Sequence, residues 1–258
     1  PQLYFDLWIR SQSISVVLLL SDGLRVFRAP SVYLIFPLQL NQVEVLVDFL
    51  WRSEKLTDGV YVASADASWD MIFTRTHDGK TKVLLCGPAF KTAQVPYSSG
   101  DKHIGICYKP WAIFTGIPMT TMLNGGELLP IPSEGTFILQ GITWKFPTYE
   151  NIDEFVAEQE KRGCLKADPI IRDVLENQPV DMSLRSVQRY FIKTIGMSPR
   201  RVRQINSART AVKLLRQGRT LSEVAYELDY ADLPHMTRML RRFTGYTSDG
   251  NKHRGEPV

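Results

Sequence analysis

The spacing of apolar residues divides the chain into a strand-like part and a helical part. Over residues 43–129, short runs of β-branched and aromatic residues predict strands. These runs are VYVAS (60–64), WDMIFTRT (69–76), KVLLCG (82–87) and HIGICY (103–108). The turn-forming sequence HDGKT (77–81) predicts a hairpin between two of them. From Asn151 onward the apolar residues recur at helical spacing. We therefore expect an α+β fold, with a β-rich, barrel-like domain followed by an all-α domain.

The same change of pattern gives the expected boundaries. Residues 1–40 have no clear pattern and are treated as a poorly specified extension. The expected order after it is a β-rich domain (41–150), a helical connector (151–182), an all-α domain (183–247) and a tail (248–258). The apolar run SVVLLL is too short to span a membrane, and no signal peptide is predicted, so a cytoplasmic, nucleoid-associated protein is expected.

The all-α domain begins with the segment MSLRSVQRYFIKTIGMSP (182–199), which has the pattern of an amphipathic recognition helix. Ser183 can cap this helix at its start, and Gly196 can end it. The polar face, opposite the apolar stripe, carries Arg185, Gln188, Arg189 and Lys193. Arg and Gln have the paired donors and acceptors that match guanine and adenine edges in the major groove. This segment is therefore expected to contact DNA bases.

A second segment, residues 220–245, predicts a supporting helix, a turn and another recognition helix. Thr220 and Glu223 form a T-x-x-E capping box, and Asp232 can cap the helix after the turn. The outward-facing residues of that helix are His235, Arg238, Arg241 and Arg242. The two segments together predict a domain with two helix-turn-helix motifs.

A long helix is expected between the two segments, from Ser198-Pro199 to Gln217. About 19 residues at about 1.5 Å each give about 28 Å, close to the roughly 34 Å of one DNA turn. Its length therefore suits two recognition helices in successive major grooves. Arg200 and Arg201 at its start, together with Lys193, are candidate contacts to the DNA backbone.

Charge is distributed unevenly along the 258 residues. Residues 183–245 hold 13 Lys or Arg and 4 Asp or Glu, a net charge of +9, whereas residues 1–182 hold 16 and 21, a net charge of −5. A basic module joined to an acidic one favours a polyanionic partner for the basic part, here double-stranded DNA. The alternative is a helical protein-interaction module whose basic side chains are only solvated.

Catalytic and metal chemistry find little support in the sequence. The three cysteines lie far apart and show no metal-ligand spacing, so neither a metal nor another cofactor is expected. The remaining alternative is an enzyme with a β-rich catalytic domain and an accessory helical domain. Asp66 and Asp70 are paired carboxylates four residues apart, but no His-x-His pattern accompanies them. We therefore do not expect an enzyme.

The helical part resembles the AraC/XylS family of bacterial transcription regulators from Ser183 to about Thr247. The resemblance rests on S-x-R-S-V-Q-R-Y-F, G-M-S-P, A-R-x-A-x-x-L-L-R-x-G, L-S-E-V-A-Y-E-L-x-Y-x-D and P-H-M-T-R-x-L-R-R-F-T-G. It implies sequence-specific DNA binding, with two recognition helices in adjacent major grooves. By position, the implied base contacts are Arg185, Gln188 and Arg189 in the first unit and His235 and Arg238 in the second, with Arg241 and Arg242 nearer the backbone. Asp229 stands where the family usually has Gly, and Asp accepts left-handed geometry better than most residues.

The N-terminal part is similar, through DASWDMIF (66–73), LLCGP (84–88) and GICYKP (105–110), to the sensor half of one AraC subgroup. Such halves sense a small molecule or mediate dimerisation. The resemblance implies control by a small-molecule effector, with RNA polymerase and a second copy of the chain as further candidate partners. An aromatic pocket lined by Trp69, Asp70, Tyr108 and Trp111 is the hypothesis for the effector site, and the alternative for each residue is the domain core.

Overall fold

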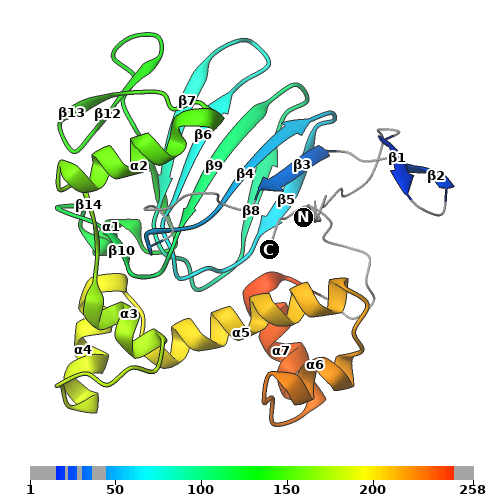
Figure 1. Ribbon diagram of the computed structural model, residues 1–258, viewed down its shortest axis with the longest axis vertical. Coiled ribbons are helices and arrows are strands. Elements are labelled where there is room, and N and C mark those ends of the chain that lie inside the picture. The colour runs from blue at the N-terminus through cyan, green and yellow to red at the C-terminus, as the bar shows by residue number, and fades with distance from the viewer. Residues whose placement is uncertain (1–15, 21–22, 28–30, 37–44, 247–258) are drawn as a thin grey trace, which may run out of the picture.

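The computed structural model describes residues 16–20, 23–27, 31–36 and 45–246, which form a β-rich part above a helical part (Figure 1). Within the expected extension, β1 (Val16–Leu20) and β2 (Gly23–Phe27) pair as an antiparallel hairpin. Residues Ser31–Phe36 of the same expected extension form β3, which joins the main sheet. The remainder of residues 1–40 and the expected tail (248–258) lie outside the described residues. The α+β fold class is confirmed.

A six-stranded antiparallel sheet with the order β11-β7-β6-β9-β4-β3 is the centre of the β-rich part. Its strands are β3 (Ser31–Phe36), β4 (Val47–Lys55), β6 (Asp70–Arg75), β7 (Thr81–Cys86), β9 (Lys102–Tyr108) and β11 (Gly126–Leu128). The predicted hairpin joins β6 to β7, where the Thr76 N–H donates to the Lys80 carbonyl. Among the described strands β3 and β11 are open edges, so the sheet curls without closing into a barrel.

Three two-stranded sheets surround this sheet, with the smallest of them reaching toward the helices. They are β5 (Gly59–Ala63) with β8 (Ala93–Tyr97), β12 (Thr136–Leu139) with β13 (Ile142–Lys145), and β10 (Ala112–Phe114) with β14 (Leu165–Ala167). The short helix α1 (Met119–Met122) lies between β10 and β11 in the chain.

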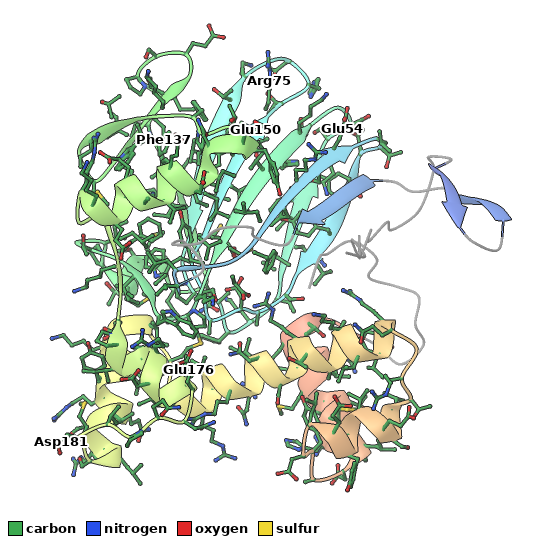
Figure 2. All side chains as sticks on the ribbon, in the orientation of Figure 1. Glu54, Arg75, Phe137, Glu150, Glu176 and Asp181 are labelled. Carbon is green, nitrogen blue, oxygen red and sulfur yellow. The ribbon has the colours of Figure 1, made fainter. Side chains whose placement is uncertain are left out.

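One face of the six-stranded sheet packs into an aromatic core beneath α2 (Ile152–Lys161), which follows the 3-10 turn η2 (Tyr149–Asn151). Phe73 on β6 contacts the edge of Phe137 at 5.6 Å between ring centroids, and Trp144 contacts Phe155 of α2 at 5.5 Å. Figure 2 shows Phe137 within this layer and Glu54 and Arg75 at the end of the sheet far from the helical part. The opposite face of the sheet is therefore left for the cavity described below.

Five helices form the helical part, and the sequence signals for their ends are confirmed. They are α3 (Pro169–Leu175), α4 (Leu184–Ile195), α5 (Pro199–Arg216), α6 (Leu221–Glu227) and α7 (Leu233–Thr244). Ser183, Ser198, Thr220 and Asp232 each accept a backbone N–H at a helix start. The apolar stripes of the helices meet in one core that includes Phe191, Ile205, Val224, Met236 and Phe243.

The expected connector (151–182) is divided between the two cores. Its first helix, α2, packs into the aromatic core, and β14 pairs with β10 of the β-rich part. Ile171 of α3, by contrast, is fully buried in the helical core. Ala65 and Ala67 of the β-rich part are buried in that helical core too, so the two parts share an apolar contact. The expected domain limits themselves stay a prediction.

Candidate nucleic-acid interface and ligand cavity

The first candidate recognition helix, α4, separates a buried stripe from an exposed basic face. Val187, Phe191 and Ile195 are buried, since they recur at the spacing that places them on one side of a helix. The side chains predicted to contact DNA from this helix are all exposed: Arg185, Gln188, Arg189 and Lys193. The helix ends at Gly196, whose φ of 71° is left-handed, as expected for a glycine stop.

The first unit also has a supporting helix, α3. The Asp168 carboxylate caps α3 by accepting the Ile171 N–H at 3.0 Å. Its second oxygen accepts the Tyr190 hydroxyl of α4 at 2.7 Å. This carboxylate therefore fixes α3 against α4, and burial followed by this hydrogen bond raises the pKa of Tyr190 to about 12.

The second unit consists of α6, a turn and α7. Thr220 and Glu223 form the predicted capping box, with the Thr220 N–H donating to Glu223 Oε2 at 2.7 Å and the Glu223 N–H donating to Thr220 Oγ1 at 3.2 Å. Asp229 in the turn has a φ of 54°, so the expected left-handed geometry is confirmed. Met236, Leu240 and Phe243 of α7 are buried. The turn thus directs α7 across α6 with its apolar side inward.

The predicted DNA contacts of α7 differ in accessibility. Arg238, Arg241 and Arg242 are exposed, whereas His235 is half-buried. The His235 ring lies edge-on to Tyr230 at 5.7 Å between centroids. Its Nδ1 is buried without a hydrogen-bond partner among the described residues. His235 is therefore less available to a base edge than its arginine neighbours.

The long helix α5 joins the two units. Its 18 residues span about 27 Å at about 1.5 Å each. Arg200 at its start is exposed. The guanidinium of Arg201 lies 5.6 Å from the centroid of the Phe243 ring, and Arg242 lies 5.4 Å from the same ring. Burial and the charge of Arg242 lower the pKa of Arg201. Arg201 therefore connects α5 to the end of α7.

Both candidate recognition helices have their C-terminal ends against the β-rich part (Figure 1). A Cβ on Gly196, after α4, would lie 2.7 Å from Leu123 Cδ1, and a Cβ on Gly245, after α7, would lie 3.1 Å from Val62 Cγ1. The N-terminal turns of both helices therefore lie on the side away from the β-rich part. Recognition helices contact base edges mainly through their N-terminal residues.

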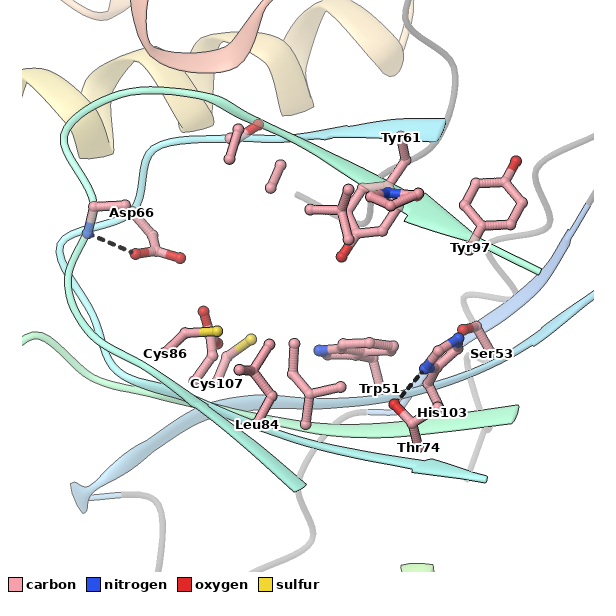
Figure 3. Close-up of a pocket in the computed structure, with 18 of the residues that line it drawn as sticks. Trp51, Ser53, Tyr61, Asp66, Thr74, Leu84, Cys86, Tyr97, His103 and Cys107 are labelled. Carbon is pink, nitrogen blue, oxygen red and sulfur yellow. Dashed lines mark hydrogen bonds between the residues drawn. The ribbon is translucent and has the colours of Figure 1, made fainter. Parts of the chain in front are cut away.

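The β-rich part contains a cavity of about 440 Å³ between the six-stranded sheet and the β5–β8 sheet (Figure 3). Trp51 of β4 is the centre of its floor, and the indole lies over Gly105, where any Cβ would overlap the ring. Other apolar side chains of the lining are Phe49, Ile72, Leu84 and Val95. A mostly apolar middle with polar groups toward its ends is typical of small-molecule sites.

One end of the cavity carries neutral polar groups and a buried lysine. His103 Nδ1 and Thr74 Oγ1 are hydrogen-bonded at 2.9 Å, while His103 Nε2 and Ser53 Oγ are buried without a hydrogen-bond partner among the described residues. Burial, and then the charge of Lys55, lower the pKa of His103 to about 4, so the imidazole is neutral. The Lys55 ammonium lies 4.4 Å from the Tyr97 ring centroid.

The other end of the cavity is acidic. Asp66, Asp70, Cys86 and Cys107 line it, and Arg209 of α5 joins them from the helical part. Burial, followed by the charge of Asp70, raises the pKa of Asp66 well above its ordinary value. Burial also raises the pKa values of both cysteine thiols. Neither thiol is therefore an activated nucleophile.

Residues 178–248 match the family model of a helix-turn-helix domain. This range contains all of α4, α5, α6 and α7. The C-terminal part of the chain is an AraC-type helix-turn-helix domain. An AraC-type domain binds double-stranded DNA, so the match supports a DNA-binding regulator of transcription. No curated protein and no solved structure is significantly similar to the chain.

The four residues predicted to contact an effector all lie in the β-rich part, but they do not lie together. Asp70 lines the cavity. Trp69 and Tyr108 do not, because they pack against Phe114 in the aromatic core on the other face of the sheet. Trp111 packs beside the helical core, and its Nε1 donates to the Val45 carbonyl at 2.6 Å. Of the four residues expected to form an aromatic pocket, only Asp70 therefore lines the cavity.

Sequence reasoning missed most of the cavity lining. Trp51, Ser53 and Lys55 alternate along β4, so strand periodicity alone could have placed them on one face. Nothing in the sequence predicts that Arg209 lines the cavity, because its position there depends on how α5 packs against the β-rich part. Within the described residues no cluster of His, Cys, Asp and Glu can hold a metal ion. No described helix is long and apolar enough to cross a membrane.

Proposed function

We propose that the chain is a sequence-specific transcription regulator in which α4 and α7 contact two adjacent major grooves of one operator. The observation that carries this proposal is the shared arrangement of the two helices. Each buries its apolar stripe, exposes cations and directs its N-terminal turns away from the β-rich part. A five-turn helix of about 27 Å separates them, close to one turn of DNA.

The exposed side chains suggest a division of roles within each helix. Arg185, Gln188 and Arg189 of α4 and Arg238 of α7 are the proposed base contacts, since Arg and Gln pair with purine edges. His235 is a secondary base contact because it is half-buried. Lys193, Arg200 and Arg201, with Arg241 and Arg242 at the end of α7, are proposed contacts to phosphates.

The cavity supports control by a small molecule. It lies between two sheets, has an apolar floor at Trp51 and carries buried polar atoms without partners among the described residues, as at Ser53. Arg209 of the AraC-type domain is one of its lining residues, so an occupant of the cavity would contact both parts of the chain. Contacts with RNA polymerase and with a second copy of the chain stay predictions from the sequence.

The test begins with DNA fragments selected from a random library by the full chain. Fluorescence anisotropy then compares the affinity of wild type, Arg238→Ala and Lys145→Ala for the selected sequence and for a scrambled one. Lys145 is the matched control, since it is an exposed cation on β13 and outside the helical part. We expect Arg238→Ala to weaken binding by about 1–3 kcal/mol and Lys145→Ala to leave it unchanged. Failure to enrich any sequence, or equal affinities for selected and scrambled DNA, would contradict the proposal.

A further inference from the structure

The acidic end of the cavity is shared between the two parts of the chain. Asp66 and Asp70 come from the β-rich part, and Arg209 comes from the middle of α5. Burial lowers the pKa of Arg209, but the nearby charge of Asp66 and of the other acidic groups outweighs burial and leaves that pKa raised. Of the carboxyl groups that raise the pKa of Arg209, Asp66 has the largest effect, followed by Asp48 and then Asp70.

The two carboxyl groups form a compact pair. Asp66 is hydrogen-bonded through its side chain to Asp70, and burial together with the Asp70 charge favours its protonated form. The Ser68 and Ala89 N–H groups both approach Asp66 Oδ1 at 3.4 Å, which is long for a hydrogen bond. A cation placed beside the pair would let both groups ionise, since an opposite charge nearby favours the charged form.

Ser53 at the far end of the cavity is an independent reason to expect a polar ligand group there. Ser53 is only 5% exposed, lines the cavity, and its Oγ has no hydrogen-bond partner among the described residues. Buried polar atoms are normally hydrogen-bonded. His103 Nε2, at the same end of the cavity, is also buried without a hydrogen-bond partner among the described residues. His103 lies at this end of the cavity and Cys107 at the acidic end, four residues further along β9. At about 3.3 Å per residue, the two ends are about 13 Å apart along the strand.

We propose that the cavity binds a small organic amine whose ammonium group lies between Asp66 and Asp70. The carbon skeleton packs on the Trp51 indole, which also attracts a cation through its ring face. A polar group at the far end of the ligand reaches Ser53 and His103. An anion is disfavoured at the acidic end because it would have to displace the carboxyl groups that already attract Arg209, and a neutral ligand gains no charge interaction there.

The ammonium group would also carry the signal to the AraC-type domain. It has the same charge as the Arg209 guanidinium, and both lie at the same end of the cavity. The ammonium group therefore competes with Arg209 for the same carboxyl groups, whose attraction to Arg209 connects α5 to the β-rich part. By reciprocity, whatever binding does to the affinity for DNA, DNA does to the affinity for the amine.

The first experiment measures ligand class on the full chain by isothermal titration calorimetry. The probes are tyramine, tyrosol and 3-(4-hydroxyphenyl)propionate, which share a phenol and carry an ammonium, a hydroxyl or a carboxylate at the other end. Hexane-1,6-diamine and hexane-1,6-diol repeat the comparison without a ring. We expect each amine to bind at least about ten-fold more tightly than its alcohol or acid counterpart. Equal or tighter binding of the alcohols or the acid, or no binding of either amine, overturns the proposal.

Variants locate the ammonium group. Asp70→Asn and, as a second isosteric change, Asp66→Asn should each remove the preference for the amine. Glu127→Gln should preserve it, because Glu127 is an exposed carboxylate on β11 that does not line the cavity. Thermal unfolding of each variant shows whether it is folded. Folded Asp66→Asn or Asp70→Asn protein that still prefers amines contradicts the assignment.

The second experiment measures coupling, and it rests on the proposed function. The affinity for selected DNA is measured with and without saturating tyramine, and we expect a change of at least about five-fold in wild type. Arg209→Gln should abolish the response, whereas Lys213→Gln, an exposed cation one turn further along α5, should retain it. A response that survives Arg209→Gln contradicts this route. If wild-type protein does not bind the selected DNA, the proposed function is contradicted. The amine proposal is then still tested separately, by the calorimetric comparison of amines with alcohols and acids.

Discussion

The Ala65 N–H donates to the Phe243 carbonyl at 2.6 Å, and both residues are fully buried. Carbonyl groups in the last turn of a helix have no partner within the helix, so this bond satisfies one of them at the end of α7. Ala65 directly precedes Asp66, which lines the acidic end of the cavity. One short loop therefore contacts α7 through its backbone and the cavity through its side chain.

Phe191 and its neighbour Ile192 differ in burial and together test the packing of the helical core. Its side chain is fully buried, while that of the next residue, Ile192, is 52% exposed. Phe191→Ala is expected to lower the free energy of unfolding by about 3–5 kcal/mol, because it removes buried apolar surface and leaves a cavity. Ile192→Ala should change it by less than about 0.5 kcal/mol. Urea denaturation followed by circular dichroism measures both, and similar losses in the two variants would be inconsistent with this core.

Asp229 tests the backbone of the second turn. Its φ of 54° is left-handed, which costs an ordinary side chain about 1 kcal/mol but costs glycine nothing. We expect Asp229→Ala to destabilise the chain by about 1 kcal/mol and Asp229→Gly to be at least as stable as wild type. Thermal unfolding in parallel gives the order. An alanine variant more stable than the glycine variant would mean that the turn is not left-handed.

His103 makes the stability of the chain depend on pH. Its folded pKa of about 4 lies below its ordinary value of 6.5, chiefly because it is buried. Between these values the unfolded chain binds a proton that the folded chain does not, so the free energy of unfolding falls as the pH falls from 7 to 4. The expected contribution is about 2 kcal/mol, allowing for partial screening by solvent.

His103→Asn should remove that part of the pH dependence, and the exposed His77→Asn should leave it in place. Urea denaturation at pH 7, 5.5 and 4 gives the comparison, and an NMR titration follows the His103 ring directly. A ring that becomes protonated near pH 6.5 in the folded chain would show that it is not buried at the cavity wall.

Gly105 tests the cavity floor. A Cβ at this position would overlap the Trp51 indole, whereas a Cβ on Gly125 would meet its nearest atom, the Thr121 carbonyl oxygen, at an ordinary 3.6 Å. Gly105→Ala is therefore expected to cost about 1–3 kcal/mol and to displace the indole, and Gly125→Ala to be tolerated. Chemical denaturation measures stability, and tyramine calorimetry reports the floor. Unchanged stability of Gly105→Ala would argue against the indole lying over this strand.

Local signals predicted most of the helical part. The caps at Ser183, Thr220 and Asp232 and the helix end at Gly196 depend on a few neighbouring residues, and each lies where the sequence predicts it. These signals work because the orphan backbone groups of a helix end are satisfied by residues close in the chain.

The cavity could not be predicted in the same way. Trp69 precedes the cavity residue Asp70, and Tyr108 follows the cavity residue Cys107, yet both aromatic residues face the core. Adjacent residues in extended chain point to opposite faces, and an aromatic side chain is equally suited to a core and to a ligand wall. Arg209 reaches the cavity only through the docking of α5, a long-range contact that no local pattern encodes.

In the proposed complex, α4 and α7 of one chain contact two adjacent major grooves. Methylation interference on a selected operator tests it most directly, with wild type, Arg185→Ala and Arg238→Ala compared at saturating protein. We predict two clusters of essential guanines about 10–10.5 base pairs apart. Arg185→Ala should relax one cluster, and Arg238→Ala the other. A single cluster, or loss of the same guanines in both variants, would contradict it.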